Sequence, residues 1–104
     1  MDDFNVNLSE PAEHDLRDIA RYISSQLNAP MNAIRMIREI RQSVAGLESN
    51  AVLYPLVRDD RLSALGYRSL RIKSYVAFYR ADEKQKTVVV DRILYSRRDW
   101  ANFL

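Results

Sequence analysis

The sequence predicts a small α+β domain in which a helical hairpin packs on one face of a mostly antiparallel sheet. Three observations indicate this class. Two long stretches of the first half carry apolar residues three or four positions apart, which is typical of amphipathic helices. Three shorter stretches of the second half alternate apolar and polar residues, as half-buried strands do. The length of 104 residues is typical of one domain, so we expect residues 1–104 to fold as a single unit.

The N-terminal segment is expected to form a strand followed by a helix. Residues 4–8 alternate with period two, and Ser9 then offers a side-chain oxygen to cap a helix. Pro11 is compatible with a first helical turn, whose N–H groups have no partner within the helix. The apolar stripe that follows at helical spacing is Ala12, Leu16, Ile19, Ile23 and Leu27.

A second helix is expected after the break at Asn28-Ala29-Pro30, ending near Gly46 and Ser49-Asn50. Its apolar stripe is Ala33, Ile34, Ile37, Ile40, Val44 and Leu47. Two antiparallel helices joined by a short turn form a helical hairpin. We expect the core residues of the hairpin to pack between the helices and against Leu70, Ile72, Phe78 and Val90 of the strands. These core residues are Leu16, Ile19, Ile23, Ile37, Ile40 and Val44.

The second half is expected to be mainly strand. Residues 53–57 are predicted to be extended or irregular, and residues 58–61 (RDDR) a charged surface loop. Strands are predicted over 67–73, 75–81 and 87–95, with a tight turn at Ser74 and a hairpin loop over 82–86. Strict alternation in the last strand would place Val88, Val90, Arg92 and Leu94 on one face. Residues 97–104 are expected to form a short helix or tail that either seals the sheet through Trp100 and Phe103 or leaves them exposed for docking.

Composition excludes several classes of function. Hydrophobic residues make up 47% of the chain and charged residues 29%, as in ordinary globular proteins and unlike disordered chains. The sequence has no cysteine and a single histidine, so we expect no disulfide, no metal site and no cofactor. His14 lies off the apolar stripe and is expected to be exposed. No apolar run approaches the roughly 20 residues that cross a bilayer, and a cytoplasmic protein without membrane contact is expected.

Charge is distributed unevenly along the chain. Residues 1–57 carry five basic and eight acidic side chains, giving −3, whereas residues 58–104 carry eleven and six, giving +5. Most of the basic residues in the second half are arginines, which bind phosphates and carboxylates through paired hydrogen bonds. This half is therefore either a solvated basic face or a surface for a polyanion or acidic protein.

One group of basic and aromatic residues falls at strand ends: Arg71, Lys73, Tyr95, Arg97 and Arg98. Such a surface can neutralise phosphates, and arginine and lysine can support RNA cleavage without histidine. The tyrosines can equally be packing residues. Arg92, which lies among valines, is expected to pair with an acid for structural reasons.

Residues 66–80 (GYRSLRIKSYVAFYR) and 92–100 (RILYSRRDW) resemble the core and the ending of the RelE/ParE toxin family. The opening strand, residues 8–12 (LSEPA) and the helical hairpin agree with the same family. The resemblance implies a cytoplasmic toxin of a bacterial type II toxin–antitoxin system, which inhibits growth, stabilises plasmids and is neutralised by a cognate antitoxin. It also implies that operator DNA is bound only indirectly, through the antitoxin.

The family divides by target. RelE-like members are ribosome-dependent messenger RNA endonucleases, and in that branch Arg71, Lys73, Arg92 and Tyr95 would be the catalytic residues. That branch commonly has an arginine directly after the tyrosine that opens the penultimate strand, whereas this chain has Val76 there. The departure favours the ParE-like branch, which inhibits DNA gyrase. Target or antitoxin would then be bound by Arg71, Lys73, Tyr95, Arg97, Arg98 and Trp100. The alternatives are a RelE-like enzyme acting on the ribosome and its message, and a non-catalytic nucleic-acid-binding module.

Overall fold

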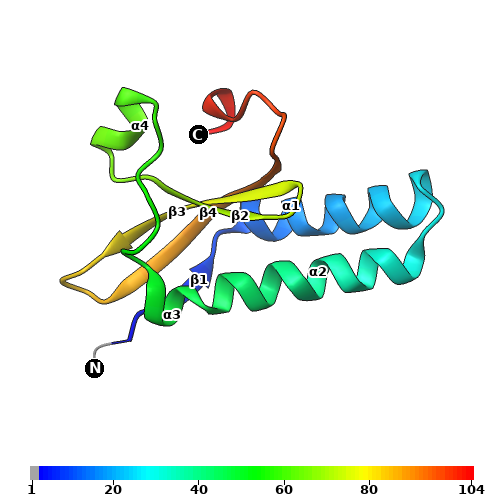
Figure 1. The fold of residues 1–104 in the computed structure, drawn as a ribbon, viewed down its shortest axis with the longest axis horizontal. Coiled ribbons are helices and arrows are strands. Elements are labelled where there is room, and N and C mark those ends of the chain that lie inside the picture. Colours follow the sequence, from blue (N-terminus) through cyan, green and yellow to red (C-terminus); the bar gives the residue numbers. More distant parts are fainter. Residues whose placement is uncertain (1–2) are drawn as a thin grey trace.

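The computed structural model describes residues 3–104 and shows an α+β fold (Figure 1). The strands are β1 (Asn5–Leu8), β2 (Arg68–Ile72), β3 (Tyr75–Asp82) and β4 (Thr87–Tyr95). The helices are α1 (Glu10–Arg21), continued by a π-helical turn η1 (Tyr22–Gln26), then α2 (Pro30–Ala45), α3 (Leu47–Asn50) and α4 (Asp60–Ala64). A 3-10 turn η2 (Trp100–Phe103) ends the chain. The predicted strand, helical hairpin and three further strands are confirmed.

The four strands form one sheet in the order β1-β4-β3-β2. β1 runs parallel to β4, whereas the β3–β4 and β2–β3 pairs are antiparallel, so the sheet is mostly antiparallel as predicted. The hairpin of α1 and α2 covers one face, and α4 with the C-terminal segment lies over the other (Figure 1). Within residues 3–104, every helix is too short or too polar to cross a membrane.

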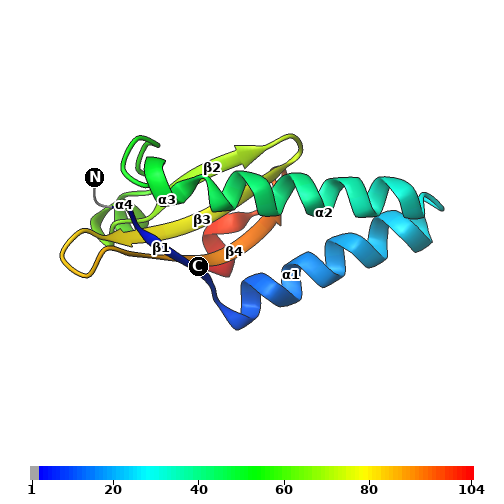
Figure 2. The same ribbon diagram turned by 90° about the horizontal axis from the view of Figure 1, so that it is seen from below.

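The hairpin forms where the sequence places it, but it extends beyond the sheet (Figure 2). The Ser9 hydroxyl accepts a hydrogen bond from the Ala12 N–H at 3.1 Å and caps α1, and Asn28 turns the chain at a φ of 51°. Leu16 and Ile40 are buried as predicted, and Ile37 is half-buried at the margin of the core. Leu27 and Ile34, which lie on the same apolar stripes, are 56% and 54% exposed, because the tip of the hairpin has no sheet beneath it.

A β-bulge in β4 changes which side chains face the hairpin. Phe78 pairs with Arg92, but the next residue, Tyr79, pairs with Val90, so Asp91 is an extra residue in β4. Val90 and Ile93 therefore both lie in the core under the hairpin. Leu94 packs with Phe78 in a second cluster, which lies beneath α4 and the C-terminal segment. The prediction of strict alternation through β4, and of Phe78 as a partner of the hairpin, is wrong for this reason.

The second cluster depends on α4, which begins at Asp60, within residues 58–61 that were predicted to form a charged surface loop. The Asp59 carboxylate accepts a hydrogen bond from the Leu62 N–H at 3.0 Å, which caps α4. Leu62 is fully buried and packs with Val57, and the Trp100 ring stacks on Phe78 with their centroids 5.1 Å apart. Both faces of the sheet are thus covered, and Trp100 seals the sheet.

Candidate functional site

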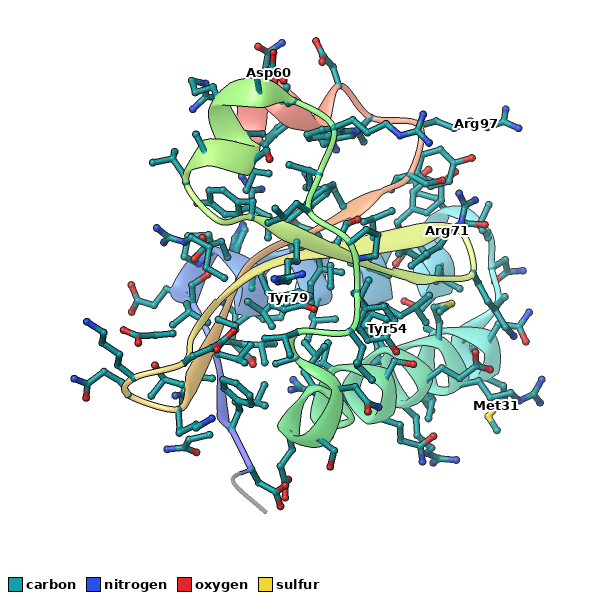
Figure 3. The ribbon with its side chains drawn as sticks, turned by 60° about the vertical axis from the view of Figure 1, so that its left-hand side comes forward. Met31, Tyr54, Asp60, Arg71, Tyr79 and Arg97 are labelled. Atoms are coloured by element: carbon teal, nitrogen blue, oxygen red, sulfur yellow. The ribbon has the colours of Figure 1, made fainter. Side chains whose placement is uncertain are left out.

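The predicted basic and aromatic residues gather at one end of the sheet. The turn between β2 and β3 lies beside the end of β4, where the Ser96 N–H donates to the Ser74 carbonyl at 2.8 Å. This contact joins the turn to the start of the C-terminal segment, and Arg71 and Arg97, which come from these two segments, both have exposed side chains (Figure 3). The register of β3 and β4 adds Tyr95, which is 43% exposed.

The β2–β3 turn is tight although it contains no glycine. Lys73 adopts the left-handed conformation with a φ of 54°, a strained geometry for a residue with a side chain. The Arg71 Nε donates to the Lys73 carbonyl at 2.9 Å, and the Lys73 ammonium lies 3.0 Å from the Glu39 carboxylate of α2. The first contact closes the turn on β2, and the second holds it against the hairpin.

A groove of about 850 Å³ runs between the hairpin and this end of the sheet. Aromatic and aliphatic side chains line it, including Tyr22, Leu27 and Met36 from the hairpin and Tyr75, Ile93 and Tyr95 from the sheet. Its charged side chains have both signs: Arg35, Lys73, Arg92, Arg98, Asp15, Asp18 and Glu39. Tyr22 and Leu27, which the sequence analysis did not assign to a site, are 53% and 56% exposed here. The groove is therefore suited to an apolar segment.

Two of its tyrosines meet edge to face. The Tyr75 and Tyr95 rings lie 6.0 Å apart at 69°. Burial raises the pKa of the Tyr75 phenol, and the nearby phenols of Tyr22 and Tyr95 raise it further. Tyr75 is therefore neutral at physiological pH and offers the groove a hydroxyl donor and an aromatic surface rather than a base.

Arg92 is held inside the fold by Asp15 of α1. Its Nε and Nη2 atoms donate to the two Asp15 oxygens at 2.8 and 2.7 Å, and the Ile93 N–H donates to the same carboxylate at 2.9 Å. The Asp15 hydrogen bond raises the pKa of the Arg92 guanidinium, which also lies 5.3 Å from the centre of the Phe103 ring. The predicted acid partner of Arg92 is confirmed.

That partner was not identified from the sequence, although a signal exists. Asp15 stands three residues after Ala12 and four before Ile19, so it falls on the apolar stripe of α1. An acid on a buried stripe requires a hydrogen-bonded cation.

Of the remaining predicted residues, Trp100 lies apart from the groove and packs on the opposite face of the sheet. Arg98 lines the groove, and its guanidinium lies 4.4 Å from the centre of the Phe103 ring. Val76 also belongs to the cluster on that opposite face, where it is partly buried. His14 is exposed on α1 as predicted, 3.6 Å from Asp18. Residues 3–104 contain no group of three or more acidic or histidine side chains placed to hold a metal ion.

Comparisons with known proteins agree with this architecture. A family model described as "ParE toxin of type II toxin-antitoxin system, parDE" matches residues 6–100. The fold is similar to a chain of the chromosomal ParDE toxin–antitoxin system of P. aeruginosa, with a TM-score of 0.74 and 20% identity over 91% of this chain and 98% of that one. It is also similar to a chain of the RelBE2 toxin–antitoxin complex of Mycobacterium tuberculosis, with a TM-score of 0.67 and 20% identity over 89% and 98%. Comparison with curated proteins gives no match.

Proposed function

The chain belongs to the ParE toxin family of type II toxin–antitoxin systems, and from this premise we propose that it inhibits DNA gyrase by binding rather than by catalysis. The observation that carries the proposal is the environment of Val76. This side chain packs with the apolar cluster that also contains Phe78 and Leu94, at the position where the ribonuclease branch commonly has a phosphate-binding arginine. Loss of one such donor typically lowers the rate by about 100- to 1000-fold. Arg92 is a second cation that could bind the phosphate in a ribonuclease. In this structure its guanidinium is already bound to the Asp15 carboxylate.

The experiment tests purified protein in parallel for inhibition of gyrase supercoiling and for cleavage of messenger RNA on programmed ribosomes. We expect supercoiling to stop while the message stays intact. Codon-dependent cuts with normal supercoiling would contradict the proposal.

Ribosome-dependent cleavage is the second candidate because Arg71, Lys73, Tyr95 and Arg97 are all exposed and belong to segments that end at the same end of the sheet. Electrostatic catalysis depends on where charge is placed more than on which residue supplies it. Under this alternative, Arg71→Ala or Tyr95→Ala abolishes the cuts. If the protein inhibits gyrase, the natural chain does not cleave messenger RNA, and the two variants do not cleave it either.

We propose further that a cognate acidic antitoxin neutralises the protein by covering the basic end of the sheet. Support comes from the exposed cations Arg71, Lys73, Arg97 and Arg98, and from the fact that the two similar structures are toxin–antitoxin complexes. Operator DNA would then be reached only through the antitoxin. A test is induced production in a bacterial host, where we expect growth arrest that the product of the adjacent gene relieves. Normal growth with confirmed soluble protein would contradict both proposals.

The binding surface itself is tested by charge reversal. Arg97→Glu is expected to weaken antitoxin binding at least about tenfold, because an acidic partner would face repulsion in place of attraction. Arg58→Glu, which changes an exposed arginine before α4, is the matched control and should bind normally. Equal affinities for the two variants would show that the antitoxin lies elsewhere.

The salt dependence of binding distinguishes a toxin from a non-catalytic nucleic-acid-binding module. That function predicts that the free protein binds DNA or RNA with an affinity that falls steeply as salt rises. We expect no specific binding by the free protein, as measured by gel shift over a salt series.

A further inference from the structure

The outer edge of β1 offers unused backbone hydrogen-bonding groups. Within residues 3–104, β1 is the first strand of the sheet order and pairs only with β4. The Asn5 N–H donates to the Lys86 carbonyl and the Ser9 N–H to the Val90 carbonyl, so the odd-numbered residues direct their backbone groups toward β4. Because these groups alternate along a strand, Val6 and Leu8 direct their N–H and C=O groups outward. Phe4 follows the same alternation: its N–H points outward and donates to the Glu48 carbonyl of α3 at 2.8 Å.

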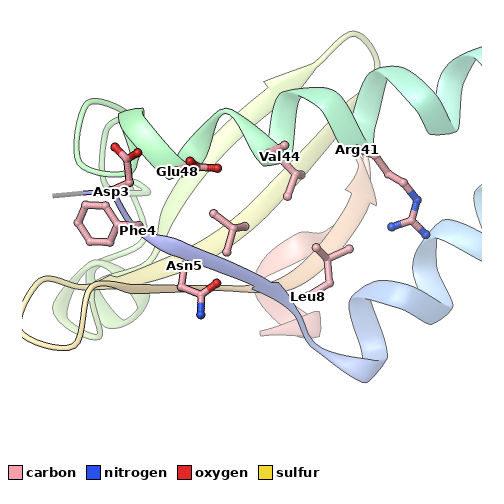
Figure 4. Close-up of a pocket in the computed structure, with 9 residues that line it drawn as sticks. Asp3, Phe4, Asn5, Leu8, Arg41, Val44 and Glu48 are labelled. Atoms are coloured by element: carbon pink, nitrogen blue, oxygen red, sulfur yellow. The ribbon is translucent and has the colours of Figure 1, made fainter. Parts of the chain in front are cut away.

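A groove of about 510 Å³ accompanies this edge, between β1 and the C-terminal half of α2 (Figure 4). Phe4, Val6, Leu8 and Val44 give it apolar walls. Its charges are divided between its ends: Asp3 and Glu48 lie at the Phe4 end, and Arg41 lies toward the Leu8 end (Figure 4). The Arg41 side chain is 52% exposed, and its guanidinium donates two hydrogen bonds to the Glu13 carboxylate of α1 at 3.3 and 3.4 Å.

This polarity makes the edge complementary to itself. When two identical strands pair antiparallel, the Leu8 end of each lies against the Phe4 end of the other, which sets Arg41 against the acidic end of the second copy. The register that places Val6 opposite Leu8 of the second copy uses both outward-facing residues of each chain. A shift by two residues in one direction would require the Phe4 N–H, which Glu48 already occupies.

We propose that β1 is a dimerisation edge, at which two copies of this chain pair antiparallel with Val6 opposite Leu8 of the second copy. The sheets of the two copies then form one continuous sheet across a two-fold axis at Asn7. A strand of four residues gives a small interface, so the dimer is weak and forms at high protein concentration. This inference does not depend on the proposed target.

Single cysteines test the register directly, because the natural chain has none. In this dimer the two Asn7 residues face each other as a non-hydrogen-bonded pair with Cα atoms about 4.5 Å apart, within the range that a disulfide spans. Asn5 is the matched control, since it is also exposed and on the same side of β1. The two Asn5 residues would be displaced by about 14 Å along the strands, which no disulfide spans.

We expect Asn7→Cys to form a disulfide-linked dimer under mild oxidation at least about tenfold faster than Asn5→Cys, with both variants folded by circular dichroism. Equal rates would indicate random collision and would overturn the proposal, as would the absence of cross-linking in Asn7→Cys. Sedimentation that shows only monomer for the natural chain at about 1 mM would also overturn it.

Charge exchange gives an independent test that local misfolding cannot mimic. Arg41→Glu and Glu48→Arg should each weaken self-association at least about tenfold, because every contact between charged ends becomes repulsive. A mixture of the two variants restores attraction at both ends and should dimerise as well as the natural chain. A mixture that stays monomeric while the natural chain dimerises would show that these ends do not meet.

Discussion

The buried carboxylate of Asp15 connects α1 to β4. Among residues 3–104 it is the only charged residue that is fully buried, at 6% exposure. Its carboxylate receives hydrogen bonds from the Arg92 side chain and from the Ile93 N–H, which follow the bulge in β4. One side chain thus joins α1 to the irregular part of the sheet and satisfies groups that would otherwise be buried without partners.

We predict that Asp15→Ala lowers the free energy of unfolding by about 3 kcal/mol, because it leaves the Arg92 guanidinium and the Ile93 N–H without their acceptor. Asp18→Ala, on the exposed side of the same helix, should cost less than about 0.5 kcal/mol. Urea unfolding of both variants measures the difference. Equal costs would mean that the buried pair adds nothing beyond a surface contact.

The phenol of Tyr79 gives a prediction on pH. Tyr79 is fully buried, its hydroxyl donates to the Ala51 carbonyl at 2.6 Å, and burial raises its pKa to about 12. Between its unfolded value of about 10 and about 12, the unfolded state loses the proton while the folded state keeps it, so stability falls as pH rises. The loss for one such group is at most about 1.4 kcal/mol per pH unit.

Tyr67 and Tyr75 act in the same direction, since burial raises their pKa values as well. The contribution of Tyr79 is therefore measured as a difference. Tyr79→Phe should be less stable at pH 8 by about 1 kcal/mol, because it leaves the Ala51 carbonyl without its donor. The variant should then lose less stability than the natural protein between pH 10 and 12. Parallel pH dependences would contradict this assignment.

At the scale of elements, the sequence predicts the two helices of the hairpin but not how far they extend beyond the sheet. Its apolar stripes were recognisable because burial imposes a spacing of three or four residues on any helix that packs on a sheet. The spacing does not reveal where the sheet ends. Leu27 and Ile34 continue the pattern into a region with nothing to pack against.

The strands show the same limit. Their positions were predicted from alternation, but the bulge at Asp91 reverses that alternation within β4, and no glycine or proline marks it. α4 escaped prediction because a helix of five residues with Leu62 as its one buried anchor has no periodicity to detect. The basic members of the candidate site were identified from charge alone. Asp15 could have been identified from its place on the apolar stripe of α1, whereas Tyr22 required the tertiary structure.

A pair of leucines on the first stripe tests this interpretation. Leu16→Ala should cost about 2 to 5 kcal/mol, because Leu16 is 2% exposed in the core. Leu27→Ala should cost less than about 1 kcal/mol because its side chain is mostly in solvent. If Leu27 serves the groove, its truncation weakens partner binding instead, which isothermal titration with the antitoxin measures. A stability loss equal to that of Leu16→Ala would place Leu27 in the core.

On the scale of the whole molecule, acidic and basic residues are concentrated in different elements of the fold. The first half of the chain, at −3, supplies β1 and the hairpin, while the second half, at +5, supplies three strands and the C-terminal segment. Long-range attraction of an acidic partner is therefore directed toward the sheet rather than toward the helices. The aromatic groove lies where these two halves meet.

This arrangement predicts how the antitoxin associates. Raising NaCl from about 50 to about 500 mM should slow association by about tenfold and change dissociation less, because salt screens steering more than close contacts. The double variant Arg97→Glu/Arg98→Glu should associate slowly at low salt and respond weakly to added salt. Arg17→Glu, at an exposed position of α1, is the control and should keep the normal dependence. Stopped-flow or surface plasmon resonance rates over a salt series provide the measurement. If both variants follow the natural protein, the basic end of the sheet does not direct the encounter, and the partner must be guided by the apolar contacts of the groove.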